Sequence, residues 1–429
     1  MMGRACLRAL VLTGVVLHPA SARAQSATDL ATTTRGPATQ LTPQPGSAGL
    51  PTPIDPASCS KSDGDWAERA LIRSQVPQLG LPPMPHPDDN PPTAAKIELG
   101  RKLFFDRRLS INKTMSCAMC HVPEQAFTTW KLQSAVGVEG RSVKRNSPTL
   151  LNVGFLNPLF HDGRDETLET QFIAPLVARN EMANPSAGWV VSFLNRDSTY
   201  HARFQGAFGA PASLDRMGQA LAAYQRSLLA GNAPFDRWHY GGEADALSPA
   251  QKRGFELFTG KADCAGCHPI GDDHALFTDQ AFHDTGYGFL REEMRQNPPE
   301  TTRVQLAPGV FVDVDFDRVA SVSSKREADL GRYEITEDPA DRWKFRTPGL
   351  RNVAMTGPYM HDGGFNTLRE VLDFYNEGGP GHPEQSPLVY PLGLSDAELG
   401  DLEAFLESLT SPNLNCLAAE ARSQPPDNH

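Results

Sequence analysis

The chain of 429 residues lacks the features of several familiar classes of protein. It has no surplus of basic residues, since 40 Lys and Arg stand against 51 Asp and Glu and give a formal net charge of −11. A nucleic-acid-binding protein needs basic residues to neutralise phosphates, and this balance argues against one. No segment reaches the ~18 apolar residues of a membrane-spanning helix. No segment shows a convincing ladder of alternating apolar residues either, so the sequence predicts few strands.

The N-terminus predicts export. Arg4 and Arg8 form a charged start, residues 7–17 are mostly apolar, and residues 22–24 (Ala-Arg-Ala) fit a small-x-small cleavage site, so residues 1–24 resemble a signal peptide. We therefore expect a periplasmic protein, whose mature charge falls from −11 to −14 because three Arg are removed with the signal. Residues 25–65 are rich in Pro, Thr, Ser and Ala. Such a segment buries too little apolar surface to offset its ordering entropy and is expected to be a flexible tether.

Four of the seven cysteines stand in two short motifs, Cys117–His121 (CAMCH) and Cys264–His268 (CAGCH). Each reads Cys-x-x-Cys-His, which is the attachment motif of c-type haem. The two thiols can bond the two vinyl groups, and the adjacent His ligates iron from one face. A thioredoxin-like redox pair or half a zinc site would not require the His. The sequence therefore predicts two covalently bound haem c groups, held by Cys117, Cys120 and His121 and by Cys264, Cys267 and His268.

Three cysteines remain, namely Cys6, Cys59 and Cys416. Cys6 would leave with the signal peptide. Because disulfides form in oxidising compartments, a disulfide between Cys59 and Cys416 is a hypothesis for the exported chain.

The chain also repeats itself. Residues 148–168 share Pro, Leu, Asn and Val positions and a His-Asp-Gly triplet with residues 348–368, at a constant offset of 200. The two haem motifs are only 147 positions apart, so the second half carries an insertion between its haem motif and this block. Helix-like segments precede both motifs, at 93–105 and 249–258, and others are expected at 214–228 and 395–409.

These patterns predict a mostly α-helical, loop-rich fold. We expect two cytochrome c-like haem domains related by internal duplication, with an N-terminal domain at 66–240, a C-terminal domain at 241–416 and a tail at 417–429. Duplication of this kind favours function at the contact between the halves.

Residues 93–410 resemble the bacterial di-haem cytochrome c peroxidases and their MauG-like relatives. The resemblance rests on both haem motifs and on the segments Arg145–Thr149, His161–Arg164, Thr347–Val353 and Pro358–Gly363. It implies that peroxide reacts at the haem of His121 and that the haem of His268 transfers electrons. It also implies a distal pocket in which the acid/base residue Glu181 moves a peroxide proton, with Gln171 and Pro175 lining the same pocket.

The resemblance further implies a calcium ion between the haems. By position, Asn146 would supply a side-chain oxygen, and Thr356 and Pro358 would supply backbone carbonyls. Oxygen ligands of this kind suit Ca²⁺. The alternative is that these residues have ordinary turn roles.

The sequence departs from the peroxidases of this family at two iron-ligand positions. Where they carry a second His ligand on the peroxidatic haem, this chain has Gly137-Val138, so the iron would be open without reductive activation, as in MauG-like proteins. Where they carry an axial Met on the electron-transfer haem, this chain has Tyr375, and MauG-like proteins place a Tyr ligand there. A phenolate favours ferric iron. Tyr375 also fits a plain helical core stripe, and Met355 and Met360 remain alternative ligands.

A third departure concerns the position between the haems, where the family usually has a Trp that relays electrons. Here that residue is His161, a poorer carrier of an electron hole, which could equally serve to pack or to hydrogen-bond a loop. Trp130, Trp189 and Trp343 are possible substitutes that the sequence does not place.

Three functions are open. The first is a periplasmic peroxidase that reduces hydrogen peroxide with electrons from a small redox carrier protein. The second is a MauG-like enzyme that uses peroxide to oxidise residues of a partner protein. The third is a non-catalytic di-haem electron carrier, against which Glu181, Gln171 and the absent distal His argue. We predict a peroxide-dependent oxidoreductase and favour the periplasmic peroxidase among the three functions.

Overall fold

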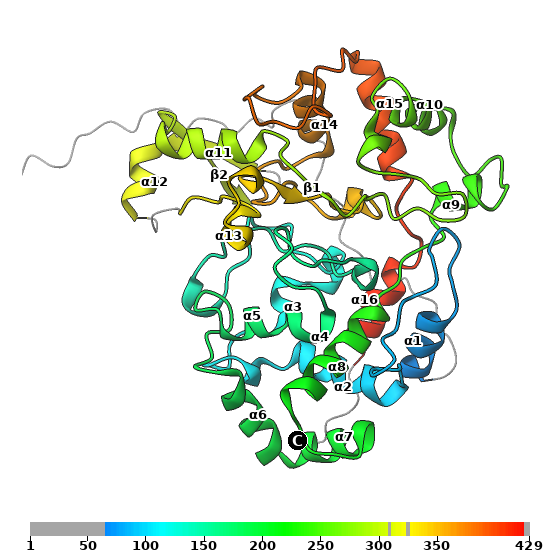
Figure 1. Ribbon diagram of the computed structural model, residues 1–429, viewed down its shortest axis with the longest axis vertical. Helices are drawn as coiled ribbons and strands as arrows, with labels where there is room; N and C mark the ends of the chain where they lie inside the picture. Colours follow the sequence, from blue (N-terminus) through cyan, green and yellow to red (C-terminus); the bar gives the residue numbers. More distant parts are fainter. Residues whose placement is uncertain (1–64, 308–309, 323–326, 424–429) are drawn as a thin grey trace, which may run out of the picture. The chain divides into compact units, whose positions relative to one another are not determined.

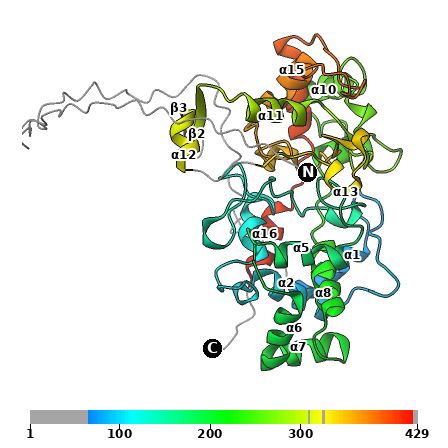
Figure 2. The same cartoon turned by 60° about the vertical axis from the view of Figure 1, so that its left-hand side comes forward.

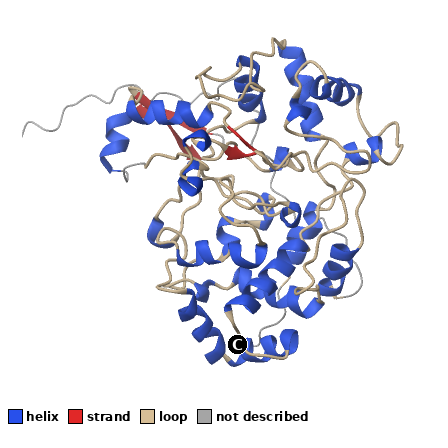
Figure 3. Ribbon diagram, in the orientation of Figure 1, coloured by secondary structure: helices blue, strands red, loops and turns tan. Residues whose placement is uncertain are grey.

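The computed structural model describes residues 65–307, 310–322 and 327–423, which belong to one compact unit of the chain. Helices dominate these residues and strands are few (Figure 3). The prediction of a mostly helical fold is confirmed. The predicted signal peptide and almost all of the predicted tether lie outside the described residues. Among the residues described, no helix is long and apolar enough to cross a membrane.

The elements follow one another along the chain as Figure 1 labels them. The α-helices up to the middle of the chain are α1 (Trp66–Gln75), α2 (Ala94–Phe105), α3 (Cys117–Cys120), α4 (Leu168–Gln171), α5 (Ile173–Val177), α6 (Ala187–Arg196), α7 (Ser198–Phe208) and α8 (Leu214–Arg226). Those that follow are α9 (Pro234–His239), α10 (Pro249–Thr259), α11 (Tyr287–Gln296), α12 (Phe316–Val322), α13 (Tyr333–Thr336), α14 (Leu368–Glu377), α15 (Asp396–Glu407) and α16 (Leu414–Arg422). The strands are β1 (Phe282–His283), β2 (Thr301–Ala307), β3 (Val310–Asp315) and β4 (Phe345–Arg346). Four 3-10 turns border the sites described below: η3 (Pro123–Gln125), η5 (Val153–Phe155), η6 (Cys264–Gly266) and η8 (Val353–Met355).

Helices α2, α8, α10 and α15 form where the sequence predicts them, and α2, α10 and α15 begin at polar caps. The Thr93 hydroxyl accepts a hydrogen bond from the Lys96 N–H of α2 at 3.2 Å. Ser248 and Ser395 each form a capping box with the Gln or Glu three residues further on. Such side chains satisfy backbone N–H groups that have no partner in the first helical turn.

In each half, the helix before the haem motif crosses a later helix at a glycine. A Cβ on Gly100 of α2 would lie 1.9 Å from the carbonyl oxygen of Ala220 in α8. A Cβ on Gly254 of α10 would lie 2.0 Å from the carbonyl oxygen of Asp401 in α15. Only glycine allows backbones to approach this closely. The same close crossing therefore supports both haem motifs.

Each crossing is the centre of its own hydrophobic core. In the first core Phe104 packs against Tyr224 with ring centroids 5.3 Å apart, and in the second Phe258 packs against Phe405 at 5.0 Å. The first core uses residues 70–230 and 414–421, and the second uses residues 235–277 and 353–409. Each haem motif is thus joined to a separate apolar cluster.

The repeated sequence blocks also fold alike. Asn152 and Asn352 both have left-handed backbone conformations, with φ of 60° and 61°, and each precedes a 3-10 turn, η5 or η8. Isolated bridges then join Leu159 to Asp165 and, 200 positions later, Tyr359 to Phe365. The amide oxygen of Asn152 accepts the backbone N–H of Ala230, which follows α8, and that of Asn352 accepts the backbone N–H of Ser411, which follows α15.

The C-terminal helix α16 packs on the first core instead of the second (Figures 1 and 2). Its apolar side chains join that core at Leu414, Leu417, Ala418 and Ala421. Glu420 forms ion pairs with Arg69 and Arg73 of α1, at 3.3 and 2.9 Å. Residues 417–422, which the sequence analysis assigns to a tail, are therefore part of an ordered helix. Cys416 in this helix is disulfide-bonded; its predicted partner, Cys59, lies outside the described residues.

The insertion of the second half contains a hairpin that the sequence analysis did not predict. Strands β2 and β3 pair antiparallel, with Val304 opposite Val312 and Thr302 opposite Val314. Valine recurs at every second position of β3, and this alternation is the local pattern of a strand. The hairpin is too short to alter the helical character of the fold.

Candidate haem sites and catalytic cavity

The first haem motif forms the short helix α3 and the residue that follows it. Cys117 and Cys120 are half-buried and form no disulfide. His121 ends the helix, and its Nδ1 lies 3.2 Å from the carbonyl oxygen of Phe127. Burial lowers the pKa of His121, which favours the neutral imidazole. A neutral ring that donates Nδ1–H to a carbonyl leaves Nε2 available as a metal ligand.

The second haem motif repeats this geometry. Cys264 begins η6 and Cys267 follows it, and neither forms a disulfide. The Nδ1 of His268 lies 2.7 Å from the carbonyl oxygen of Phe277, and burial lowers the pKa of this imidazole as well. Phe127 and Phe277, the two accepting residues, both have positive φ, at 56° and 53°. The two loops therefore turn in the same way to orient their histidines.

A cavity lies over the first motif. It encloses about 750 Å³ of space, including its open mouth. Its wall is mainly apolar and includes residues of α2, α5 and α8. The lining residues are Leu103, Phe104, Leu109, Met115, Ser116, Cys117, Cys120, His121, Leu150, Gln171, Phe172, Pro175, Leu176, Glu181, Met182, Met217, Leu221 and Gln225. An apolar wall with two thiols and an available imidazole on one side fits a covalently attached haem.

The structure brings the three predicted catalytic residues to this cavity. Gln171 at the end of α4, Pro175 in α5 and Glu181 in the following turn all line it together with His121. Burial is the main cause that raises the pKa of Glu181, and the positive charge of Arg164 opposes the shift. A raised pKa makes a carboxylate a better proton acceptor, which suits a residue that takes up and then releases a proton.

A neighbouring loop holds the turn that carries Glu181. The Val138 N–H donates to the carbonyl oxygen of Glu181 at 3.0 Å, and the Arg141 guanidinium donates to the carbonyl oxygen of Arg179 at 3.0 Å. Gly137 packs so tightly that a Cβ would lie 2.1 Å from the carbonyl oxygen of Asn180. The stretch at which the peroxidases of the family carry a distal His therefore contacts the backbone of Glu181 directly.

This contact yields a testable expectation for Gly137. Its φ of −93° and ψ of −151° are open to alanine, so Gly137→Ala would act only through the clash with the turn. We expect a shifted Glu181 and a rate constant for the peroxide reaction reduced by up to about 100-fold, as for small misplacements of catalytic groups. Stopped-flow absorption of the haem-loaded protein measures it. Gly206→Ala, where a Cβ meets nothing within 4 Å, is the matched control. An unchanged rate in Gly137→Ala would contradict the positioning role.

Tyr375 lies beside the second haem motif. It projects from α14, and its pKa is raised by burial and by the nearby Cys267 and Cys264. Of the alternative ligands, Met355 packs against the first hydrophobic core. Met360 is half-buried and has a left-handed backbone conformation. The predicted Tyr is thus placed next to the motif by the fold.

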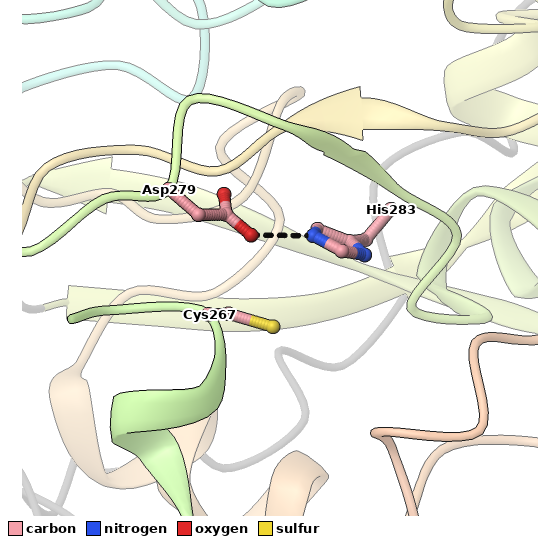
Figure 4. Close-up of side chains that lie close together, drawn as sticks. All are labelled: Cys267, Asp279 and His283. Carbon is pink, nitrogen blue, oxygen red and sulfur yellow. Dashed lines mark hydrogen bonds and ion pairs between the residues drawn. The ribbon is translucent and has the colours of Figure 1, made fainter.

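Asp279 and His283 form a pair beside Cys267 that the sequence analysis missed. His283 Nε2 lies 2.8 Å from Asp279 Oδ2, and these two ligand atoms and the Cys267 sulfur lie within 4.8 Å of one another (Figure 4). The Asp279 N–H also donates to the Cys267 carbonyl at 3.0 Å. Because Cys267 belongs to the haem motif, this pair borders the second haem site. Asp279 precedes the short strand β1 and His283 ends it, and a His and an Asp four residues apart give no signal in sequence that would place them there.

The predicted calcium residues lie where the two halves meet. The Asn146 N–H donates to the carbonyl oxygen of His361 at 2.8 Å, and the Asn146 side chain donates to the Gln133 carbonyl at 3.3 Å. Thr356 and Pro358 belong to the same loop as His361. The hydrogen bond to His361 therefore joins Asn146 to the loop that carries Thr356 and Pro358.

His161 lies at the same contact between the halves. Its Nε2 lies 3.1 Å from the carbonyl oxygen of Asn146. Burial, together with the charge of Arg145, lowers the pKa of His161 to about 3, so the ring is neutral at pH 7 and donates this hydrogen bond. Arg145 also forms ion pairs with Asp162 and Asp329, which joins the first half to the second.

The three tryptophans proposed as substitutes lie in different surroundings. Trp130 is buried, and its backbone N–H donates to Gln125 Oε1 at 2.9 Å. Trp189 on α6 is exposed. Trp343 packs edge-on against Phe289 at 5.2 Å between ring centroids.

Comparisons with known proteins agree with this geometry. The sequence profile of the family described as "Di-haem cytochrome c peroxidase" matches residues 94–245. The methylamine utilization protein MauG of Methylorubrum extorquens is 36% identical over 368 residues, which cover 85% of this chain and 91% of that protein. The cytochrome-c peroxidase IdrP1 of Denitromonas iodatirespirans is 39% identical over 355 residues, covering 80% and 89%. A crystal structure of a MauG-like protein associated with microbial copper homeostasis superposes with a TM-score of 0.64 at 32% identity, covering 79% of this chain and 96% of that one.

Proposed function

The chain belongs to the di-haem cytochrome c peroxidase family, and we propose that it reduces hydrogen peroxide at the haem of His121 with electrons that pass through the haem of His268. The observation that carries the proposal is the cavity that gathers Gln171, Pro175 and Glu181 around the first haem motif. An electron carrier without catalytic function has no need of a buried acid/base residue beside its haem.

The residues of the cavity have separate tasks in this reaction. Haem, when bound, supplies the iron at which the O–O bond of peroxide is cleaved. His121 holds it from one side through Nε2, with Nδ1 fixed by the Phe127 carbonyl. Glu181 takes the proton from the near oxygen of peroxide and delivers it to the leaving oxygen. Gln171 orients peroxide by hydrogen bonding, and the apolar wall excludes bulk water.

We further propose that the peroxide side of this haem is open in the ferric protein. The stretch Gly137-Val138 offers no His, and its backbone is engaged with the Glu181 turn. Peroxide would therefore react without prior reduction of the second haem. Adding peroxide to the ferric protein tests this directly: an immediate change of the haem absorption supports it, and reaction only after partial reduction contradicts it.

We propose that Tyr375, together with His268, would hold the second haem as an iron ligand. Tyr375→Phe is expected to raise the reduction potential by part of the roughly 0.8 V over which axial ligands act, because a phenolate stabilises ferric iron. Spectroelectrochemical titration measures it. Tyr240→Phe, which removes a hydroxyl bonded to the Gly271 carbonyl at 3.0 Å, is the control. A Met–iron charge-transfer band that persists in Tyr375→Phe would instead assign Met355 or Met360.

The finer features of the family complete the proposal. We propose that both haems are bound through thioether bonds, in two haem domains at 66–240 and 241–416 that arose by internal duplication. The equivalent Asn152 and Asn352 turns and the equivalent glycine crossings support the duplication. A calcium ion held by Asn146, Thr356 and Pro358 and a periplasmic location also belong to the proposal. The electron donor would then be a small redox carrier protein.

A second candidate function is MauG-like oxidation of a partner protein. Two observations favour it: the position of Tyr375 beside the second motif and the absence of a distal His at Gly137-Val138. A long-lived change of both haem spectra after peroxide, without added donor, would favour this function. Rapid turnover with a reduced small cytochrome would favour the peroxidase.

A further inference from the structure

Tyr287 occupies an unusual position in the second half. It is the first residue of α11, in the insertion that distinguishes the two halves, and only 3% of it is exposed. Its hydroxyl donates a hydrogen bond to Asp362 Oδ1 at 2.8 Å. Asp362 belongs to the second His-Asp-Gly triplet of the repeated blocks. A buried phenol is thus bonded to a carboxylate that can accept its proton.

The surroundings are built to allow this bond. A Cβ on Gly364 would lie 1.8 Å from the Tyr287 hydroxyl oxygen, so a glycine is required for the phenol to reach Asp362. The Gly364 N–H donates to the same carboxylate oxygen at 3.0 Å. Arg291 Nε donates to the other oxygen, Asp362 Oδ2, at 2.8 Å. Both oxygens of Asp362 are therefore fixed, and one of them points at the phenol.

Aromatic rings connect Tyr287 to the second haem site. Its ring lies 5.8 Å from the ring of Phe374, edge to face, and Phe374 lies 5.4 Å from Tyr375, measured between ring centroids. Tyr375 is the residue proposed above as the ligand of the second haem. Two ring contacts therefore separate Tyr287 from that iron ligand.

A second set of ring contacts connects Tyr287 to residues that touch the first half of the molecule. Its ring lies 5.6 Å from the His361 ring, and His361 stacks on Phe345 with centroids 3.8 Å apart. The carbonyl oxygen of His361 accepts the N–H of Asn146 from the first half. Tyr287 thus lies in a line of rings that ends at the contact between the halves. His161, the residue at the position where the family has a Trp, is held there as a neutral hydrogen-bond donor.

We propose that Tyr287 is a redox-active residue that carries an electron hole between the two haem sites, with Asp362 as its proton acceptor. The proposal rests on the peroxide reaction proposed above, which supplies the oxidant. Reduction of hydrogen peroxide to two water molecules takes two electrons and two protons from solvent; one electron is drawn from Tyr287, and the other comes from the redox carrier protein through the second haem. As the electron leaves, the O–H bond of Tyr287 breaks and its proton moves to Asp362 Oδ1, which leaves a neutral tyrosyl radical. An electron from the redox carrier protein then reduces the radical, and the proton returns from Asp362.

The chemistry of phenols explains why the hydrogen bond is needed. A phenol that has lost an electron is a far stronger acid than a carboxylic acid, so Asp362 takes the proton even while it is paired with Arg291. Without an acceptor in place, the charged radical would have to form in a buried site, where an unpaired charge is costly. The carboxylate therefore makes the oxidation of Tyr287 feasible.

The test is electron paramagnetic resonance of the haem-loaded ferric protein, frozen after addition of hydrogen peroxide. We expect a tyrosyl radical whose hyperfine pattern collapses when the protein contains ring-deuterated tyrosine. Tyr287→Phe is expected to abolish this signal, and Asp362→Asn to diminish it strongly because the acceptor is lost. Haem content and the ferric absorption spectrum verify that each variant is folded and loaded.

Tyr200→Phe is the matched control. The Tyr200 hydroxyl also donates to a carboxylate, Asp106, at 2.8 Å, and its side chain is fully buried, but its ring neighbours are Phe193 and Phe204 of the first core. The radical should persist in this variant. A signal that survives in Tyr287→Phe, or that disappears equally in Tyr200→Phe, would overturn the proposal.

The same samples separate this inference from the proposed function. A change of haem absorption after peroxide without any tyrosyl radical overturns the role of Tyr287 and leaves the peroxide reaction standing. Where peroxide leaves the absorption unchanged, the proposed function fails. In that case a ruthenium photosensitiser and an electron acceptor are used to oxidise the haem sites with a light flash, without peroxide. A tyrosyl radical that forms in the wild type and not in Tyr287→Phe supports the proposal. Absence of the radical after the flash overturns it.

Discussion

Replacing Glu181 by Gln is expected to slow the reaction of the ferric protein with hydrogen peroxide by about two to four orders of magnitude, the usual contribution of a general acid/base. Gln has the same shape but cannot take the peroxide proton. Both haems should remain bound, because Glu181 lines the cavity without supplying a thiol or an imidazole. Stopped-flow absorption at several peroxide concentrations gives the second-order rate constant.

The side chain of Glu139 offers a matched control for this experiment. It lies on the loop that contacts the Glu181 turn but is 61% exposed and paired with Arg141 at the surface. Glu139→Gln makes the same chemical change outside the cavity and leaves the Arg141 hydrogen bond to the Arg179 carbonyl in place, so its rate should stay close to that of the wild type. A Glu181→Gln variant that reacts at the wild-type rate would remove Glu181 from the mechanism.

The second large effect is expected on stability, from Asp236→Asn. Asp236 and Arg351 form a two-pronged ion pair at 2.9 Å, and their side chains are 0% and 4% exposed. Removing one charge of a buried pair leaves the other uncompensated and costs about 3–5 kcal/mol. We expect the free energy of unfolding of the haem-loaded protein to fall by this amount, as measured by urea denaturation.

The pair matters because Arg351 connects distant parts of the chain. Its guanidinium also donates to the carbonyl oxygens of Ala275 and Gly80. Asp313→Asn is the control, since its ion pair with Arg303 spans 3.8 Å and both side chains are more than half exposed. Such exposed pairs contribute little. Equal stabilities of Asp236→Asn and Asp313→Asn would contradict the importance assigned to the buried pair.

Local sequence patterns were sufficient for the elements that position the haem motifs. The capping residues Ser248 and Ser395 identify the starts of α10 and α15, because a cap acts on backbone groups two or three residues away. The hairpin of β2 and β3 was not predicted, although valine occupies alternate positions of β3. Its strands contain charged and small residues that dilute the pattern over so few positions.

The catalytic cavity was predictable only through the resemblance. Glu181 is 60 positions from His121 in the chain, and a single Glu in a sequence is usually a solvated residue. The motifs of the family assigned it a role, and the fold places it on the same cavity wall as the haem motif. The pair of Asp279 and His283 had no such motif to identify it.

The sequence by itself determined the family, the helical class and the repeated blocks, and it predicted the haem attachment residues. These depend on fixed spacings or on neighbours within a few residues. Only the tertiary structure decided which residues meet across the halves: α16 on the first core, Arg351 against Asp236, and Tyr287 against Asp362. Such contacts join positions up to hundreds of residues apart, and their partners are chosen by packing and by the need to satisfy buried polar groups. No local pattern in the chain encodes that choice.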